Sequence, residues 1–422
     1  MRALLKQNPL PAVIFTVFVD MLGIGILLPV MPRLLADPTS EYYLLPAGMS
    51  IQTGFIILGF LTASFTLAQF FAAPILGQLS DRYGRKPVLA ISLFGTALSY
   101  VMFAIGILIA NIPLLFFSRI VGGITGGNIA VAQAAIADVT TPQNRVKNFG
   151  LIGAAFGFGF IIGPYIGGKL SDPTVLPWFS AATPFWFAAI LSFLNMFSVL
   201  FFFPETHQHK NLSLVINWTK SIKNIISAYA MKEVRTIFAT NFLFQGGFAF
   251  YTSFAAVFYI ERYHFTQGNI GDFFAYIGVW IALTQAVLTR RLSGKFREYH
   301  ILRVTLLGCG IGILLYYLTN AAWQLYIIAP FFAICMGLSQ ANIAGLISRS
   351  VSPAVQGEIL GINASVQALA QSIPPMLSGF IAAKMTPESP IVVSFLVIAL
   401  AWLVFVTTYR PTQSPLSADA RS

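Results

Sequence analysis

Long apolar runs separated by short polar connections dominate this chain. Each run has the length of about 20 mostly apolar residues that an α-helix needs to cross a bilayer. The runs predict twelve such helices, at residues 10–35, 53–79, 87–109, 112–138, 146–170, 180–203, 234–262, 268–291, 300–319, 322–348, 356–383 and 389–408. Strands of a membrane β-barrel would instead alternate polar and apolar residues in pieces of about ten. We therefore predict an all-α integral membrane protein.

The composition agrees with this fold class. Hydrophobic residues make up 57% of the 422 positions and charged residues only 9%, with a mean hydropathy of +0.77. A soluble globule could not keep so much apolar surface away from water. Cys309 and Cys335 both fall inside predicted helices and lack the spacing of a disulfide or a metal site. We expect no metal ion and no cofactor.

The positive charges are distributed unevenly between the two sides of the predicted helices. Twenty of the 25 Lys and Arg residues fall in segments on the side of both termini, while Arg33, Lys169, Arg262 and Lys384 fall on the other side and Arg119 lies within a helix. Positive residues remain in the cytoplasm, so this asymmetry places both termini there. The net charge of +11 then reflects topology and attraction to anionic lipid, and it does not indicate nucleic-acid binding.

A polar connection at residues 204–233 divides the chain. We predict an N-terminal six-helix bundle at 1–203, a cytoplasmic linker at 204–233, a C-terminal six-helix bundle at 234–410 and a cytoplasmic tail at 411–422. Residues 211 positions apart match in type or mirror each other in charge: Asp138 and Arg349, Pro142 and Pro353, Gly150 and Gly361, Gly168 and Gly379. Repeated halves around a central site are common in secondary transporters.

Four segments carry recognisable motifs. Gly77-Gln-Leu-Ser-Asp81-Arg82-Tyr-Gly84-Arg85-Lys86 connects the second and third helices. The other three are Asp20 to Pro32 in the first helix, Arg119-x-x-x-Gly123-x-x-x-Gly127 in the fourth, and Gly159-Phe-Ile-Ile-Gly163-Pro164-Tyr-Ile-Gly167-Gly168 in the fifth.

These motifs resemble the signatures of the major facilitator superfamily of secondary transporters. The Gly-Pro segment of the fifth helix is similar to the antiporter motif of drug/proton exporters. Within that group, the N-terminal half is most similar to the tetracycline/proton antiporters, particularly at Ile136-Ala-Asp138 and Arg145-Val-Lys147-x-Phe149-Gly150. The resemblance implies two six-helix pseudo-repeats that work by alternating access. Tetracycline exporters carry further acids in the third and ninth helices, whereas residues 87–109 and 300–319 contain none, which argues against tetracycline as the substrate.

The resemblance implies a gate at the cytoplasmic ends of the helices. Asp81 would engage the start of the eleventh helix, near Gly357 and Glu358, when this side is closed, and the positive residues of the loop would bind nearby acids. The mirrored pair Asp138 and Arg349 would join the same network. The predicted gating residues are Asp81, Arg82, Arg85, Lys86, Asp138, Arg349 and Glu358. A loop that only sets topology is the alternative.

The glycines of the fifth helix suggest a second moving part. Gly159, Gly163, Gly167 and Gly168 share one helix face, so that a neighbouring backbone can approach closely. Pro164 removes a backbone donor and bends the helix. A close contact with a bend suits an interface that rocks between two states, and ordinary tight packing is the alternative.

Asp20 and Arg119 are the predicted proton-coupling residues. An ionisable side chain deep in a membrane helix costs about 2.5–3.5 kcal/mol on insertion scales, so it faces a cavity or a partner. Asp20 lies roughly 15 Å into the first helix and Arg119 roughly 10 Å into the fourth from the opposite side, so their depths overlap. A dry surrounding favours the protonated carboxyl group and a nearby guanidinium favours the ionised one. A static buried ion pair is the alternative.

Polar and aromatic positions midway along other helices are candidates for a substrate cavity: Asn128, Gln133, Gln245, Tyr251, Trp280, Gln285, Gln340, Asn342 and Gln367. Such a lining suits an amphipathic or polar organic solute. We predict a monomeric, proton-coupled exporter of an amphipathic drug-like compound or metabolite in a bacterial cytoplasmic membrane. A proton symporter or a carrier of a siderophore or other small polar metabolite is the alternative. The chain has no catalytic dyad, metal cluster or phosphate loop, so we do not expect an enzyme.

Overall fold

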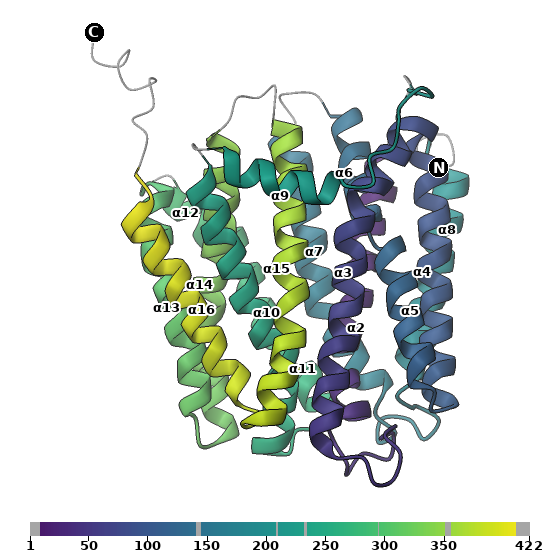
Figure 1. Cartoon of the computed structure of the whole chain (residues 1–422), viewed down its shortest axis with the longest axis vertical. Coiled ribbons are helices and arrows are strands. Elements are labelled where there is room, and N and C mark those ends of the chain that lie inside the picture. The colour runs from purple at the N-terminus through teal and green to yellow at the C-terminus, as the bar shows by residue number, and fades with distance from the viewer. Residues whose placement is uncertain are drawn as a thin grey trace.

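The protein forms a bundle of long helices that run side by side (Figure 1). A computed structural model describes residues 9–140, 145–207, 210–231, 234–293, 295–350 and 356–410. The helices before the linker are α2 (Leu10–Leu35), α3 (Ile51–Tyr83), α4 (Arg85–Leu108), α5 (Ile112–Thr125), α6 (Asn128–Asp138), α7 (Arg145–Leu170) and α8 (Thr183–Phe202). We call these helices the first group.

The helices of the linker and of the second group follow. The linker contains α9 (Lys220–Ala230). The second group consists of α10 (Arg235–Tyr263), α11 (Gln267–Leu283), a π-helical turn (Thr284–Leu288), α12 (Thr289–Ser293), α13 (Glu298–Leu318), α14 (Ala322–Arg349), α15 (Gln356–Lys384) and α16 (Ser389–Thr408). We call the ends at which α3 finishes and α4 begins the terminal face, since both chain ends lie there, and the opposite ends the far face (Figure 1).

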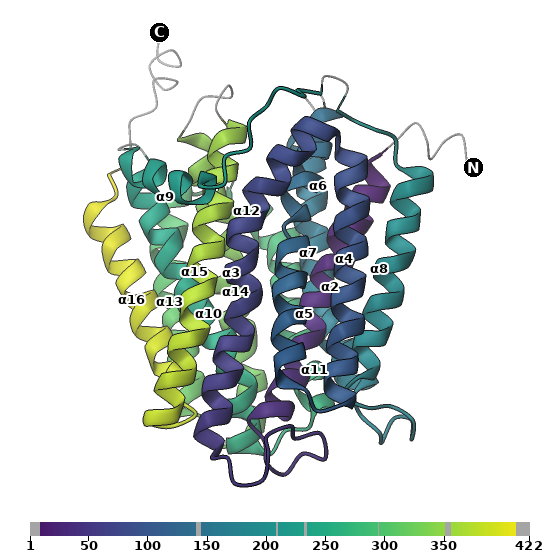
Figure 2. The ribbon, with the colours of Figure 1, turned by 45° about the vertical axis from the view of Figure 1, so that its right-hand side comes forward.

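The predicted all-α fold is confirmed, and every predicted span has a helical counterpart. Ten helical stretches among the described residues are long and apolar enough to cross a membrane. The helices α7 and α15 also run along the bundle, beside α2 and α3 respectively (Figures 1 and 2). The prediction differs from the structure in two spans that it treated as continuous and in α9, which it assigned to a polar linker.

The fourth span is interrupted within the bundle. It is divided into α5 and α6, and Gly126 closes the first part. The side-chain amide of Gln69 on α3 donates to the carbonyl oxygen of Gly126 at 2.8 Å. Backbone groups that leave a helix at membrane depth need such a partner, because no lipid atom can replace it. Gln69 therefore stabilises the interruption.

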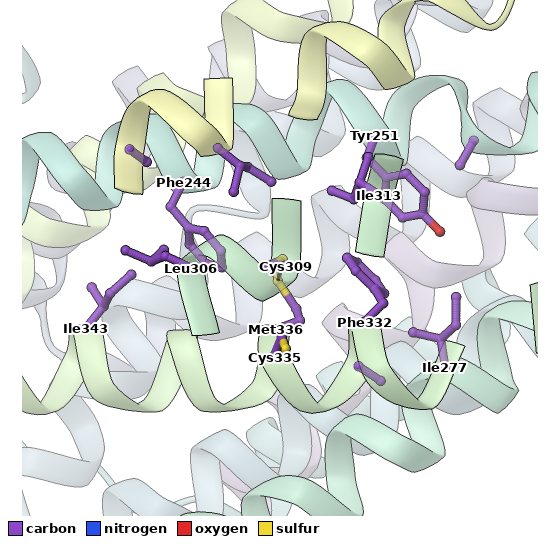
Figure 3. Close-up of a cluster of buried hydrophobic side chains, with 14 of the residues drawn as sticks. Phe244, Tyr251, Ile277, Leu306, Cys309, Ile313, Phe332, Cys335, Met336 and Ile343 are labelled. Atoms are coloured by element: carbon purple, nitrogen blue, oxygen red, sulfur yellow. Dashed lines mark hydrogen bonds between the residues drawn. The ribbon is translucent and has the colours of Figure 1, made fainter. Parts of the chain in front are cut away.

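Each group contains apolar cores, and one core of the first group also takes in Phe254, Val257 and Ala382 of the second. In the first group α2 packs on α7 and α4 packs on α8, while in the second group α10 packs on α16 and α13 on α14. Figure 3 shows part of the second core, where the sulfur atoms of Cys309 and Met336 lie 3.9 Å apart. Cys309 and Cys335 are both buried there as unpaired thiols, so they act as apolar packing residues.

Two close backbone approaches join the groups toward the far face. A Cβ atom at Gly168 on α7 would lie 3.2 Å from the Cα atom of Gly271 on α11, and a Cβ atom at Gly59 on α3 would lie 3.2 Å from the Cα atom of Gly379 on α15. Gly168 and Gly379 are a repeated pair in the sequence. The two contacts thus have the arrangement expected of related halves, with α3 and α15 adjacent in both views (Figures 1 and 2).

Candidate functional site

Asp20 is a buried carboxylate in the middle of α2. Its exposed fraction is 6%, and within the described part of the chain neither carboxylate oxygen has a hydrogen-bond partner. It borders a small cavity with room for about one water molecule. The cavity is enclosed by the first group alone and is lined by Asp20, Ile24, Phe65, Thr96, Ser99, Tyr100, Arg119, Gly122, Gly126 and Ile129. An unpartnered buried acid beside a cavity is suited to proton binding.

Arg119 lies on the other side of the same cavity, among aromatic rings. Its exposed fraction is 3%, and its guanidinium carbon lies 4.5 Å from the ring centroid of Phe103, 5.7 Å from that of Phe65 and 5.8 Å from that of Tyr100. Two of its nitrogen atoms, Nε and Nη2, have no hydrogen-bond partner among the described residues. Ring faces attract a desolvated cation, so these rings hold the charge and leave donors free.

Tyr100 borders the same cavity as the two charged residues. Its hydroxyl group occupies the space next to Gly23, one turn from Asp20 on α2. The described residues include no ion pair between Asp20 and Arg119 within 4 Å. The static direct pair that we considered from the sequence is thus not the arrangement in this structure. Sequence inspection missed Tyr100 because nothing in an apolar helix indicates which way it faces.

The connection between α3 and α4 forms a charge cluster at the terminal face. Arg85 is buried, and its guanidinium donates to Asp81 Oδ1 at 2.6 Å and to Asp138 Oδ2 at 3.0 Å. Arg85 also donates to Ser80 Oγ at 2.6 Å. Asp138 therefore lies in one network with Asp81, through Arg85. Arg82 faces the linker instead, where it donates to the carbonyl oxygen of Leu214 at 3.4 Å.

Glu205 completes this cluster and was not among the residues singled out from the sequence. Its carboxylate accepts hydrogen bonds from the backbone N–H groups of Arg85 at 2.8 Å and Lys86 at 3.3 Å. Free N–H groups and a partial positive charge lie at a helix N-terminus, so an acid there is stabilising. The carboxylate follows α8 directly and thus fastens the start of the linker to the start of α4. The sequence signal that could have identified Glu205 is an acidic residue directly after the sixth predicted span.

The predicted gate also involves residues of the second group, namely Gly357 and Glu358 beside Asp81 and Arg349 in the same charge network. Gly357, Glu358 and Arg349 lie in helices, but their side-chain surroundings fall outside what the structure describes. The proposed contact between Asp81 and the start of α15 therefore remains a prediction.

The glycines of the fifth span lie against neighbouring backbones. Gly159, Gly163 and Gly167 face α2, where an added Cβ would meet main-chain atoms of Leu22, Gly25 and Ile26. Gly168 faces α11 instead. Pro164 contributes to both contacts, because its ring lies beside Gly25 and its carbonyl oxygen beside Gly271. The segment thus fixes α7 to α2 within the first group and to α11 in the second.

The predicted cavity residues occupy different environments. Asn128 lies at the start of α6 as a buried amide without a hydrogen-bond partner among the described residues. Gln245 and Asn342 are buried, and Gln285 is exposed in the π-helical turn. Tyr251 is packed in the second core, where its hydroxyl group lies 2.7 Å from that of Tyr259 (Figure 3). The other four predicted residues are partly buried: Gln133, Trp280, Gln340 and Gln367.

Polar contacts join the two groups at the far face. Lys169 at the end of α7 forms an ion pair with Asp272 on α11, with 2.9 Å between Nζ and Oδ2. Arg33 at the end of α2 donates to the carbonyl oxygen of Phe265 at 3.1 Å. These contacts flank the Gly168–Gly271 approach, so separation of α7 from α11 would break them together.

Comparisons with known proteins agree with these features. Residues 13–375 match the family model of the Major Facilitator Superfamily. The chain is 34% identical over 370 residues to the class H tetracycline resistance protein of Pasteurella multocida, covering 86% of each chain. It is 28% identical over 378 residues to multidrug resistance protein 1 of Bacillus subtilis, covering 89% of this chain and 90% of the other.

Solved structures share the fold. The human organic anion transporter MFSD10 (TETRAN) superposes with a TM-score of 0.72 at 22% identity, covering 95% of this chain and 99% of that one. The D-xylose-proton symporter has a TM-score of 0.75 at 17% identity, covering 96% and 98% respectively.

Proposed function

The chain belongs to the Major Facilitator Superfamily, and on that premise we propose that it exchanges protons for an amphipathic drug-like compound or metabolite by alternating access. The transporter class follows from the family. The observation that carries the proton-coupled part is the unpartnered carboxylate of Asp20 beside a cavity that it shares with Arg119.

The geometry of the cavity suggests how the exchange is coupled. A buried ionised carboxylate without hydrogen bonds is disfavoured, so these surroundings favour the protonated form of Asp20. Arg119 lies against the ring of Tyr100 and keeps free donors. In the second conformation of the alternating-access cycle, water or the guanidinium group of Arg119 would come closer to Asp20. The ionised carboxylate is then stabilised, and the proton leaves. One proton would then cross in one of the two changes of state in each cycle, and the substrate would cross in the other.

The relatives support export of an organic compound. Two of them carry the words tetracycline resistance or multidrug resistance in their names, and the glycine segment of α7 resembles the antiporter motif. The helix α4 contains no Asp or Glu, and Glu298 in the first turn is the only one in α13. We therefore propose an amphipathic substrate other than tetracycline. The cavity that binds this substrate would lie between the two groups of helices.

The distribution of positive charge supports an orientation with the terminal face in the cytoplasm, because only four Lys and Arg residues fall on the far side. Arg33, Lys169, Arg262 and Lys384 all occur in the last turns of helices that end at the far face. We propose that the terminal face is cytoplasmic and that the protein resides as a monomer in a bacterial inner membrane. The far-face contacts between the groups then close the outer side.

Transport by the purified protein in liposomes tests the proposal. A panel of amphipathic drugs, including a tetracycline, is offered under an imposed pH gradient of either sign. Antiport predicts accumulation when the lumen is acidic, and symport predicts it when the exterior is acidic. This difference does not depend on how the protein is inserted.

The variant Asp20→Asn isolates the coupling role. We expect it to lose accumulation driven by the pH gradient while it still exchanges substrate down a substrate gradient. Glu41→Gln, which neutralises an exposed acid between α2 and α3, is the matched control and should behave as wild type. Gradient-driven accumulation by Asp20→Asn at the wild-type rate would contradict the proposal.

A further inference from the structure

The helix α9 crosses the long helices near the terminal face instead of running along them (Figure 1). Its sequence has two different sides. Ile222, Ile226 and Tyr229 recur at helical spacing on one side, and Trp218 precedes them by one turn. Lys220 and Lys223 are exposed on another side. The helix is therefore amphipathic.

The apolar side of α9 is not covered by the described residues. The exposed fractions are 70% for Trp218, 63% for Ile226 and 74% for Tyr229. Ser221 and Ala228 on a different side of the helix are buried and attach it to the bundle. The large apolar side chains of α9 thus lie outside its contact with the bundle. Exposed apolar stripes of this kind mark a binding surface.

The position of α9 identifies the occupant of that surface. Its C-terminus leads within a few residues to α10, and the guanidinium of Arg235 at the start of α10 lies 5.8 Å from the ring centroid of Tyr229. The helix therefore lies at the level where a span begins, which is the boundary between hydrocarbon and headgroups. An amphipathic helix with aromatic and aliphatic residues on one side and lysines on the other fits that boundary. We propose that α9 docks on the interface of an anionic bilayer.

This surface is continuous with the rest of the lipid-facing belt. Ser221 donates to the carbonyl oxygen of Phe70 on α3 at 2.8 Å, and the neighbouring Phe71 is exposed. On the other side, Asn224 donates to Ser365 Oγ on α15 at 2.9 Å. The helix is thus hydrogen-bonded to both groups, next to the pair of helices that joins them.

The depth of individual α9 residues in the bilayer tests this proposal on the whole protein, without any transport measurement. Single cysteines at positions 222, 226 and 229, and at 220, 223 and 227, are spin-labelled in liposomes of phosphatidylglycerol and phosphatidylcholine. The wild-type chain serves as the labelling control, because both native cysteines are buried. Accessibility to oxygen reports lipid, and accessibility to a water-soluble nickel chelate reports solvent.

We expect labels at 222, 226 and 229 to favour oxygen and labels at 220, 223 and 227 to favour the nickel chelate. Solvent accessibility at all six positions would overturn the proposal. Protection from both reagents at 222, 226 and 229 would also overturn it, because a protein surface would then cover them.

The charge of the lipid is tested with the same labels. Each lysine near an anionic surface contributes roughly a fivefold preference for the bound state. Lys220→Gln combined with Lys223→Gln should therefore reduce the difference in depth at 226 between anionic and neutral bilayers. Lys384→Gln removes an exposed charge at the far face and should leave that difference unchanged. An equal depth at 226 in both bilayers for the wild-type chain would refute the anionic preference.

Discussion

The contact of Gly168 with α11 offers a direct test of movement between the two groups. In Gly168→Ala the new methyl group would meet the carbonyl oxygen of Gln267 and lie 3.2 Å from the Cα atom of Gly271. Both are main-chain atoms, so no side-chain rotation can relieve the clash. Overpacking of this kind costs about 1–3 kcal/mol. The arrangement in which α7 meets α11 should become disfavoured by roughly 5- to 150-fold relative to one in which they separate.

The assay is the distance between spin labels across the far face. Exposed positions Val175, after α7, and Glu261, near the end of α10, are replaced by labelled cysteines. Double electron–electron resonance should show a larger population at long distance in Gly168→Ala than in wild type. Gly157→Ala is the matched control, because it adds the same methyl group to α7 where no neighbouring atom lies within 4 Å. Identical distance distributions in all three proteins would refute the reasoning.

Three further changes test other parts of the structure. Arg119→Lys keeps the charge but loses the planar contact with Phe103, so we expect gradient-driven transport to fall at least about tenfold while protein yield stays unchanged. Glu205→Ala leaves two N–H groups of α4 without a partner, and thermal unfolding in detergent should reveal a loss of about 1–2 kcal/mol. Lys169→Gln and Asp272→Asn break a pair whose side chains are 35% and 41% exposed, so a double-mutant cycle on the far-face distance should give a coupling of only about 0.2–1 kcal/mol.

The sequence predicted the helices well because membrane spans are defined by length and apolarity. Ends differ by a few residues, as in α8, which begins at Thr183 where Pro184 suits the first turn of a helix. The helix α9 was missed, because eleven residues that mix apolar, uncharged polar and basic types do not form an apolar run. The interruption at Gly126 was missed as well, since it depends on an amide from another helix, Gln69.

The candidate site was predictable in its charges and not in its geometry. Asp20 and Arg119 were identified because ionisable residues are rare inside spans. Their meeting with Tyr100 at one cavity depends on how α2, α4 and α5 are rotated, and helices that are apolar on all sides carry no signal for rotation. Likewise, the linker acid Glu205 was not singled out, since its role depends on the start of α4 lying beside it.

The contact between α2 and α7 limits how a proton can pass without substrate. Gly159, Gly163 and Gly167 bring the backbone of α7 against the helix that carries Asp20, so the two helices can move only as one piece. For an uncoupled leak, Asp20 would have to become accessible from both sides in turn while α7 remained on α11. The backbone contact with α7 prevents this independent motion of α2. In the absence of substrate, liposomes that contain the protein should therefore hold a pH gradient for as long as liposomes without protein.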